Sequence, residues 1–201
     1  MRLSDVRSPA SLSAQLSLEV AQRYYSPALL NHCLRSYYFA AGAGMQRGLA
    51  FDDDLLYVAA LLHDVGLTEP FDSHLVPFEE AGGHVAWVFA AGLNWPLGRR
   101  ERVHEVIVRH MGDAVDPQHD TESHLLETAT ALDIGGSNMA LWPQSFLADV
   151  VREYPRLGLA DEFGVSFEEQ ADRKPECAAA RAVRGGIRHR LASNALETIA
   201  G

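Results

Sequence analysis

The sequence predicts an all-α fold, a bundle of packed helices, on two observations. Segments with helical spacing of apolar residues follow one another, whereas no segment keeps the alternating pattern of a half-buried strand. Residues that favour helix starts and ends stand between these segments. At 201 residues the chain can bury a sizeable core, so we expect one domain spanning residues 1–201.

The first two predicted helices have clear start signals. Ser26 can cap a helix whose first position is Pro27 and which continues through residues 28–45. Asp52 can cap a second helix in residues 51–66, where further aspartates favour the positive end of the helix dipole.

The later helices are predicted from apolar periodicity and from glycine and proline breaks. They are expected at 78–92, from Pro96 past His110, at 124–134 and at 143–154. A last helical stretch begins at Phe167 and continues into a tail at 176–201, with interruptions at Pro175 and at Gly185-Gly186.

Composition narrows the class of protein. Seventeen Lys+Arg against 27 Asp+Glu leave a formal charge of −10, and Lys174 is the only lysine, so a nucleic-acid partner is not expected. Cys33 and Cys177 fit no CxxC spacing, which favours a reducing compartment. Because no apolar run reaches the length of a signal peptide or a membrane span, we expect a cytoplasmic protein without membrane contact, acting on a small molecule.

The stretch ALLHDVGLTEP, residues 60–70, contains the first sign of chemistry. His63 and Asp64 follow directly on an apolar run that should enter the core. A lone histidine on such a face is usually a hydrogen-bonded core residue. Here, however, several polar groups are expected in one core, namely His32, His63, Asp64, His84, His110 and Asp133.

Imidazole nitrogens and carboxylate oxygens are the ligands of a divalent ion, and a catalytic ion keeps one position open for water. Ligands can come from different helices of a bundle. His32, the His63-Asp64 pair and Asp133 fit this description. Neighbouring helical residues point about 100° apart, so the pair can reach one ion only near a helix end, where Gly66 places it.

An ordered set of motifs over residues 20–175 resembles the HD-domain metal-dependent hydrolases, an all-α superfamily with a metal in the core. The motifs NHCLRSYYF, LLHDVGLT and PFEEAGGHVAWVF are similar to the cyanamide hydratase-like branch, and IVRHMG, ATALDIGG, VVREYPRLGL and ADRKP follow in the same order.

The resemblance implies that His32, His63, Asp64 and Asp133 hold one divalent metal, with zinc expected first and Fe²⁺ or Mn²⁺ as alternatives. Two-metal members of the superfamily carry a histidine where this chain has Phe78, and a phenyl ring cannot bind a metal. We expect Phe78 to help shape a small, dry substrate pocket, although it would serve equally as an ordinary core residue.

Several neighbours of these motifs have two readings each. We expect His84 to be a partly buried or surface histidine, and His110 either transfers protons or lines the pocket. Arg35, one turn after His32, is expected to orient Asp64 or Asp133. Glu79 is expected either to handle protons or to pair with Arg35, and Thr68 is expected to contact the substrate. A purely structural role is an equally good interpretation of both residues.

The resemblance implies a hydratase or hydrolase that adds a metal-activated water to a small nitrile, as in the conversion of cyanamide to urea, with Asp64, Glu79 or His110 handling protons. The alternatives are a phosphohydrolase acting on a nucleotide or small phosphoester, a di-iron oxygenase, and a purely structural or binding metal site. A homodimer through the long helices is compatible with the sequence.

Overall fold

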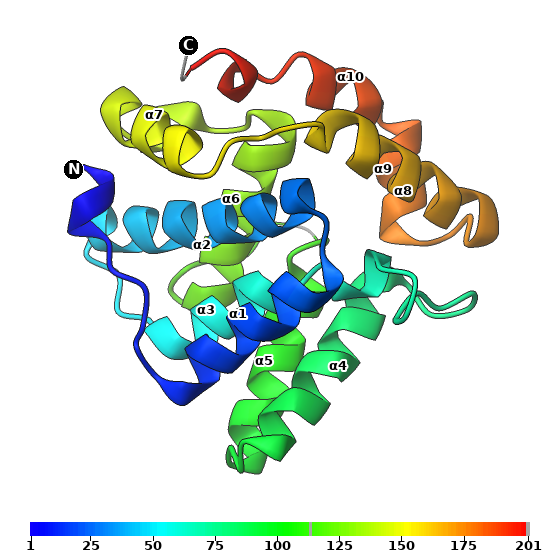
Figure 1. Cartoon of the computed structure of the whole chain (residues 1–201), viewed down its shortest axis with the longest axis horizontal. Helices are drawn as coiled ribbons and strands as arrows, with labels where there is room; N and C mark the ends of the chain where they lie inside the picture. Colours follow the sequence, from blue (N-terminus) through cyan, green and yellow to red (C-terminus); the bar gives the residue numbers. More distant parts are fainter. Residues whose placement is uncertain (113, 200–201) are drawn as a thin grey trace.

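Helix α2 (Pro27–Arg47) runs through the middle of the molecule (Figure 1). The structure is a computed structural model that describes residues 1–112 and 114–199. Within these residues it contains helices and no strand, which confirms the predicted all-α fold. One hydrophobic cluster extends along the chain from Val6 to Leu196.

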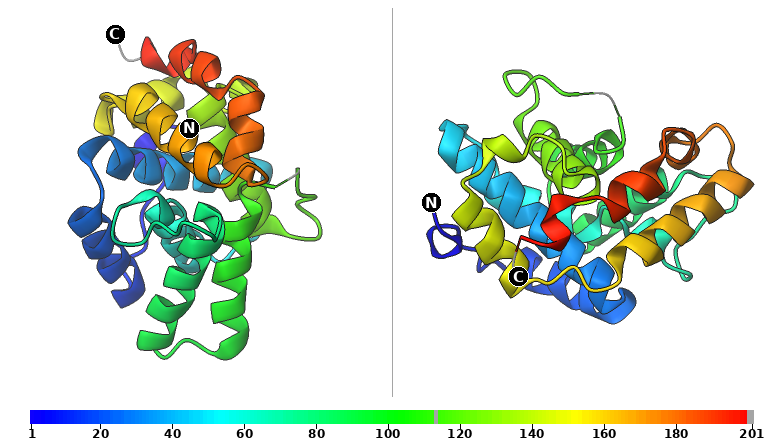
Figure 2. Two further views of the ribbon diagram at one scale, coloured as in Figure 1. Left: turned by 90° about the vertical axis from the view of Figure 1, so that its right-hand side faces the viewer. Right: turned by 90° about the horizontal axis from the view of Figure 1, so that it is seen from above.

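In the first half of the chain one helix packs against α2 and a second packs against that helix. They are α3 (Asp53–Leu62) and α1 (Leu12–Tyr24), so that α3 contacts both α2 and α1. Next come α4 (Phe78–Gly92) and α5 (Leu97–Arg109), which form an antiparallel hairpin that projects from one end of the molecule (Figures 1 and 2).

The second half of the chain covers the opposite end. Helix α6 (Thr121–Gly135) packs along α2. The C-terminal helices then lie across the end of the molecule away from the hairpin (Figure 2), and they are α7 (Gln144–Glu153), α8 (Leu159–Arg173), α9 (Ala178–Arg184) and α10 (Ile187–Ala192).

The predicted helix starts of α2 and α3 are confirmed. Ser26 Oγ accepts a hydrogen bond from the Leu29 amide at 3.1 Å, and Asp52 Oδ1 accepts one from the Leu55 amide at 3.0 Å. These bonds satisfy amide groups that the first turn of a helix leaves without a partner.

The structure contains one helix that was not predicted, and two predicted helices begin earlier than expected. Helix α1 was not predicted, because its buried face consists of alanines and serines instead of large apolar residues. Helix α6 begins three residues before His124, where Asp120 caps it. Helix α8 begins at Leu159, eight residues before Phe167.

The predicted breaks of the tail are confirmed at 175 and at 185–186, where α8, α9 and α10 are separated. Residues 200–201 of the predicted tail lie outside the described part of the chain. None of the helices that the structure describes is both long and apolar enough to cross a membrane.

Candidate metal centre

The end of α3 brings two adjacent polar residues into the core. The helix ends at Leu62, His63 keeps helical backbone angles, and Asp64 leaves them with φ −103° and ψ 8°. This change of direction lets both side chains turn to the same side, with His63 Nε2 3.1 Å from Asp64 Oδ2. The pair therefore lies at a helix end, as the sequence predicted.

Close packing of α4 against this turn requires glycine at two positions. A Cβ at Gly66 would lie 2.2 Å from the carbonyl oxygen of Phe78, and a Cβ at Gly82 would lie 2.9 Å from that of His63. Backbone approaches of this kind exclude any side chain. The glycines thus allow α4 to cover the back of the His63-Asp64 turn.

His32 of α2 joins the pair to form a buried cluster of three possible ligands. Its Nε2 lies 3.2 Å from His63 Nε2 and 3.2 Å from Asp64 Oδ2. All three residues have an exposed fraction of zero, and their ligand atoms lie close enough together to hold one metal ion.

The other ring nitrogen of each histidine is already engaged. His63 Nδ1 donates to the carbonyl oxygen of Ala60 at 2.8 Å, and His32 Nδ1 donates to Asp133 Oδ2 at 2.6 Å. A neutral imidazole has one N–H, so in both rings Nε2 is left with a lone pair. Two lone pairs therefore face the Asp64 carboxylate.

The two carboxylate oxygens of Asp64 are also hydrogen-bond acceptors, and they face the ring nitrogens of the two histidines. Neither of its buried oxygens accepts a hydrogen bond from any described residue, although the two imidazoles lie beside it. A buried charge without a partner is costly. A cation bound between His32, His63 and Asp64 would remove this cost, so the residues present fit a divalent metal.

Burial and the neighbouring groups shift the pKa values of the cluster residues. Burial acts to raise the pKa of Asp64, but His63 and His32 outweigh it, so that this pKa lies well below its usual range. Burial acts to lower the pKa of His32, yet Asp133 and Asp64 outweigh it and raise this pKa. Without an ion, a proton on an imidazole therefore balances the Asp64 carboxylate, and a bound metal takes the place of that proton between neutral rings.

Asp133 of α6 lies on the other side of the His32 ring from the three clustered groups. Its Oδ2 contacts His32 Nδ1, not Nε2. A carboxylate in this position fixes the tautomer and orientation of a metal-binding histidine. Its expected role as the fourth ligand stays a prediction, because its oxygens here bind His32 and two arginines.

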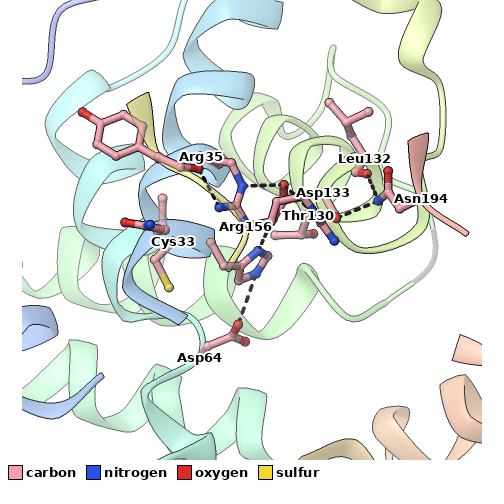
Figure 3. A network of polar contacts seen from close by, with 12 residues as sticks. Cys33, Arg35, Asp64, Thr130, Leu132, Asp133, Arg156 and Asn194 are labelled. Atoms are coloured by element: carbon pink, nitrogen blue, oxygen red, sulfur yellow. Dashed lines mark hydrogen bonds and ion pairs between the residues drawn. The ribbon is translucent and has the colours of Figure 1, made fainter. Parts of the chain in front are cut away.

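Three side chains converge on Asp133 (Figure 3). Arg35 donates from Nε to Oδ1 at 2.8 Å and from Nη2 to Oδ2 at 2.7 Å. Arg156 Nη1 donates to Oδ1 at 3.1 Å and to the Asp133 carbonyl at 2.6 Å, and Asn194 Nδ2 donates to the same carbonyl at 2.9 Å. Burial acts to raise the pKa of Asp133, but Arg35 and His32 outweigh it, and the carboxyl stays ionised.

His110 follows the end of α5 and faces the cluster. Its Nε2 lies 3.9 Å from Asp64 Oδ1, and its Nδ1 donates to the carbonyl oxygen of Ile107. Burial and the neighbouring His63 lower the pKa of His110 to about 3. The ring is therefore neutral at pH 7, with a lone pair at Nε2.

A cavity of about 110 Å³ opens on the cluster and is lined mainly by apolar side chains. None of the described residues around it is a lysine or an arginine. Its walls come from α2, α6, α8 and α10 and from the segments that follow α3 and α5. They consist of His32, His63, Asp64, His110, Met111, Thr130, Ala131, Ile134, Phe163, Phe167 and Ile187.

Two other predicted site residues lie beside the cavity without lining it. Phe78 is fully buried and its ring packs edge-on against His110, with centroids 5.8 Å apart. Thr68 Oγ1 donates to the carbonyl oxygen of Val65 at 2.7 Å and lines a separate depression near α8.

Glu79 is buried but contacts neither the cavity nor Arg35. Arg35 instead uses Asp133 and the carbonyl oxygens of Tyr154 and Pro155. The expected pairing of Glu79, in the first turn of α4, with Arg35 is therefore wrong. His84 is exposed on the surface of α4.

Sequence reasoning missed several residues of the site. Arg156 belongs to the quoted VVREYPRLGL motif, to which no role was given. Phe163 and Phe167 are spaced four residues apart, a signal for one helical face that a correct start of α8 would have revealed. Ile187 and Asn194 come from the tail beyond the family resemblance and carry no local signal.

Comparison with known proteins identifies the class. The family model of the HD domain matches residues 29–134, just over half of the chain. The matched segment extends from α2 to α6 and contains the four predicted ligands. The chain belongs to the HD domain family.

Two relatives define its branch. Cyanamide hydratase DDI2 and cyanamide hydratase DDI3, both from Saccharomyces cerevisiae (strain ATCC 204508 / S288c), are each 31% identical to the chain over 173 residues. These residues cover 83% of the chain and 76% of either relative. The chain is thus a cyanamide hydratase-like member of the family, and this membership indicates a metal-dependent enzyme.

Proposed function

We propose that the protein is a metal-dependent hydratase that adds water to a small nitrile-type substrate, as in the conversion of cyanamide to urea. The observation that carries this proposal is the buried set of lone pairs on His32, His63 and Asp64, at the wall of a small apolar cavity. The names of the two yeast relatives support the choice of substrate.

The metal would be held by His32 and His63 through Nε2 and by the Asp64 carboxylate. Asp133, the fourth ligand that the family resemblance implies, would first have to release His32 Nδ1 and move to the Nε2 side of the ring. Nitrogen and oxygen ligands in this number suit zinc, with Fe²⁺ or Mn²⁺ as alternatives. When bound, such an ion lowers the pKa of a coordinated water to about 7 and polarises a nitrile, which supplies the nucleophile and the electrophile at neutral pH.

The protein side chains orient the reactants and keep bulk water out. The rings of Phe163 and Phe167 cover the His32 side of the cavity, with the Phe163 centroid 5.4 Å from that of His32. His110 Nε2 accepts a hydrogen bond from the attacking water or from the substrate amino group. The neutral ring carries a lone pair at Nε2, with which it can orient this partner.

Proton transfer is assigned to Asp64. Hydration moves two protons from the attacking water to the nitrile nitrogen: the first moves as the C–O bond forms, and the second as the imidic acid tautomerises to the amide. Asp64 is the only carboxylate among the described residues that line the cavity, and it lies beside both imidazoles. Glu79, the other carboxylate expected to handle protons, does not line the cavity.

Phosphoester hydrolysis is the main alternative, and the charge distribution disfavours it. Phosphate groups are usually bound by arginine or lysine. The two arginines nearest the centre, Arg35 and Arg156, are occupied by Asp133. A di-iron centre would need a ligand where Phe78 packs against His110.

The test is a substrate panel with the metal-loaded protein. We expect urea from cyanamide and no phosphate from nucleotides, and the Asp64→Asn variant should produce neither. Phosphate release without urea would contradict the proposal, as would urea formation that survives in Asp64→Asn.

A further inference from the structure

A second group of metal-binding side chains lies on the projecting α4–α5 hairpin. Glu80 and His84 come from α4, and His104 comes from α5. Their ligand atoms all lie within 4.8 Å of one another. Glu80 and His84 lie within the PFEEAGGHVAWVF motif, but none of the three residues lines the core cavity.

The spacing within this hairpin cluster suits a bound ion. Glu80 and His84 are four residues apart, so they lie on one face of α4. The His84 and His104 rings have centroids 5.0 Å apart and are tilted by 42°. Glu80 Oε2 lies 3.7 Å from His104 Nε2.

The 3.7 Å distance between Glu80 Oε2 and His104 Nε2 fits two metal ligands better than a hydrogen bond. It is longer than a hydrogen bond, which for nitrogen and oxygen spans about 2.7–3.2 Å. Ligands bonded to zinc at about 2.0 Å in a tetrahedron lie roughly 3.3 Å apart. A shift of a few tenths of an ångström therefore brings both atoms into ligand positions.

His104 has a fixed position and an unused ligand atom. Its Nε2 is buried and has no hydrogen-bond partner among the described residues. The ring lies against the bare backbone of Gly83, where a Cβ would come within 2.8 Å of Cδ2 and 3.2 Å of Nε2. Gly83 thus allows the ring to approach α4 and to direct its free nitrogen toward the Glu80 and His84 side.

We propose that Glu80, His84 and His104 form a second divalent metal site, with a preference for Zn²⁺, that ties α4 to α5. Two imidazoles and a carboxylate supply three ligands, and solvent supplies the fourth at this half-exposed position. Helix α4 also packs through Gly82 against the carbonyl of His63. An ion on the hairpin would therefore stabilise the helix that covers the back of the core centre. This inference does not depend on the proposed reaction.

The experiment uses the full chain already loaded with its core metal, and Zn²⁺ alone as the probe. Equilibrium dialysis against Zn²⁺ should show one additional exchangeable equivalent per chain, and thermal unfolding should show a higher Tm, because a ligand bound only to the folded state stabilises it. Urea formation, measured alongside, should not change.

Three variants make the result specific. His84→Ala and Glu80→Gln should each lose the additional equivalent and the rise in Tm while they keep the core metal. His74→Ala, which removes an exposed histidine from the loop before α4, should behave like the unaltered chain. The inference is overturned if the unaltered chain takes up no additional Zn²⁺, or if His84→Ala still takes it up.

Discussion

The chain carries two clusters of histidines and carboxylates that differ in burial. In the core cluster, His32, His63 and Asp64 are inaccessible to solvent. In the hairpin cluster, His84 is exposed and Glu80 is half-buried. Water can solvate the hairpin groups when no ion is bound, whereas in the core only a cation or a proton can balance the lone pairs.

Orientation is the second difference between the clusters. Each core imidazole has its Nδ1 proton bound by a carbonyl or carboxylate oxygen, so its Nε2 is already directed at the neighbouring groups. No such hydrogen bond orients the described rings of the hairpin cluster. We therefore expect a tightly held ion in the core and an exchangeable ion on the hairpin.

The largest effect on stability is expected when a carboxylate is neutralised next to the core cluster. Asp133→Asn leaves Arg35 and Arg156 buried without a negative partner, which should lower the free energy of unfolding by about 3–5 kcal/mol. Chemical denaturation with urea measures this loss of unfolding free energy. The matched change on the hairpin, Glu80→Gln, should stay within about 0.5 kcal/mol, and equal losses would contradict the comparison.

The difference between the two clusters was only partly visible in the sequence. The HD doublet at the end of an apolar run was sufficient to place His63 and Asp64 in the core, since Gly66 indicates the helix end. His32 followed from the family motif. The sequence did not show on which side of the His32 ring Asp133 lies, because this depends on the packing of α6 against α2.

Long-range contacts account for most of what the sequence did not reveal. Arg156 and Asn194 reach Asp133 from segments 23 and 61 residues later in the chain. The small side chains that α1 buries produce no apolar periodicity. By contrast, α4 was predicted with both of its ends, since Pro77 precedes its first residue and a glycine closes its last turn.

The bidentate contact of Arg35 should determine how well the core holds its metal. Arg35→Lys keeps the charge but loses the two N–H donors that bind both Asp133 oxygens. Asp133, which holds His32 Nδ1, should then orient the His32 ring less firmly. We expect metal affinity to fall by about 10–100-fold, as measured by competition with a chelator.

A surface arginine with the same geometry provides the control. Arg188 binds Glu168 through Nε and Nη2, both at 2.8 Å, on the exposed side of α8. Arg188→Lys should leave metal affinity unchanged. A comparable loss in both variants would show that the fork matters for general stability and not for the centre.

The tail should influence the substrate through Ile187, which lines the cavity from α10. Ile187→Ala widens the cavity, so kcat/KM for cyanamide should fall by roughly 10-fold, with a smaller loss for a bulkier nitrile. Steady-state kinetics with both substrates measures this. An equal loss for both would mean that Ile187 does not shape the pocket.

The effect that is smallest at neutral pH is the pH dependence of stability. The pKa of His110 is lowered to about 3 from 6.5, so between these values the unfolded chain binds a proton that the folded chain does not. The stability of the fold should therefore decrease as the pH falls from 6.5 toward 3, and His110→Asn should make this decrease less steep. Denaturation midpoints at several pH values provide the measurement, and identical slopes would argue against a neutral, buried His110.

Metal content after exhaustive dialysis tests most directly the claim that the core lone pairs hold one ion. The exchangeable ion that we propose for the hairpin would be removed by this treatment. We predict one retained metal per chain in the unaltered protein and none in folded His63→Ala. Full retention in His63→Ala, or a folded and active protein with no retained metal, would contradict the account.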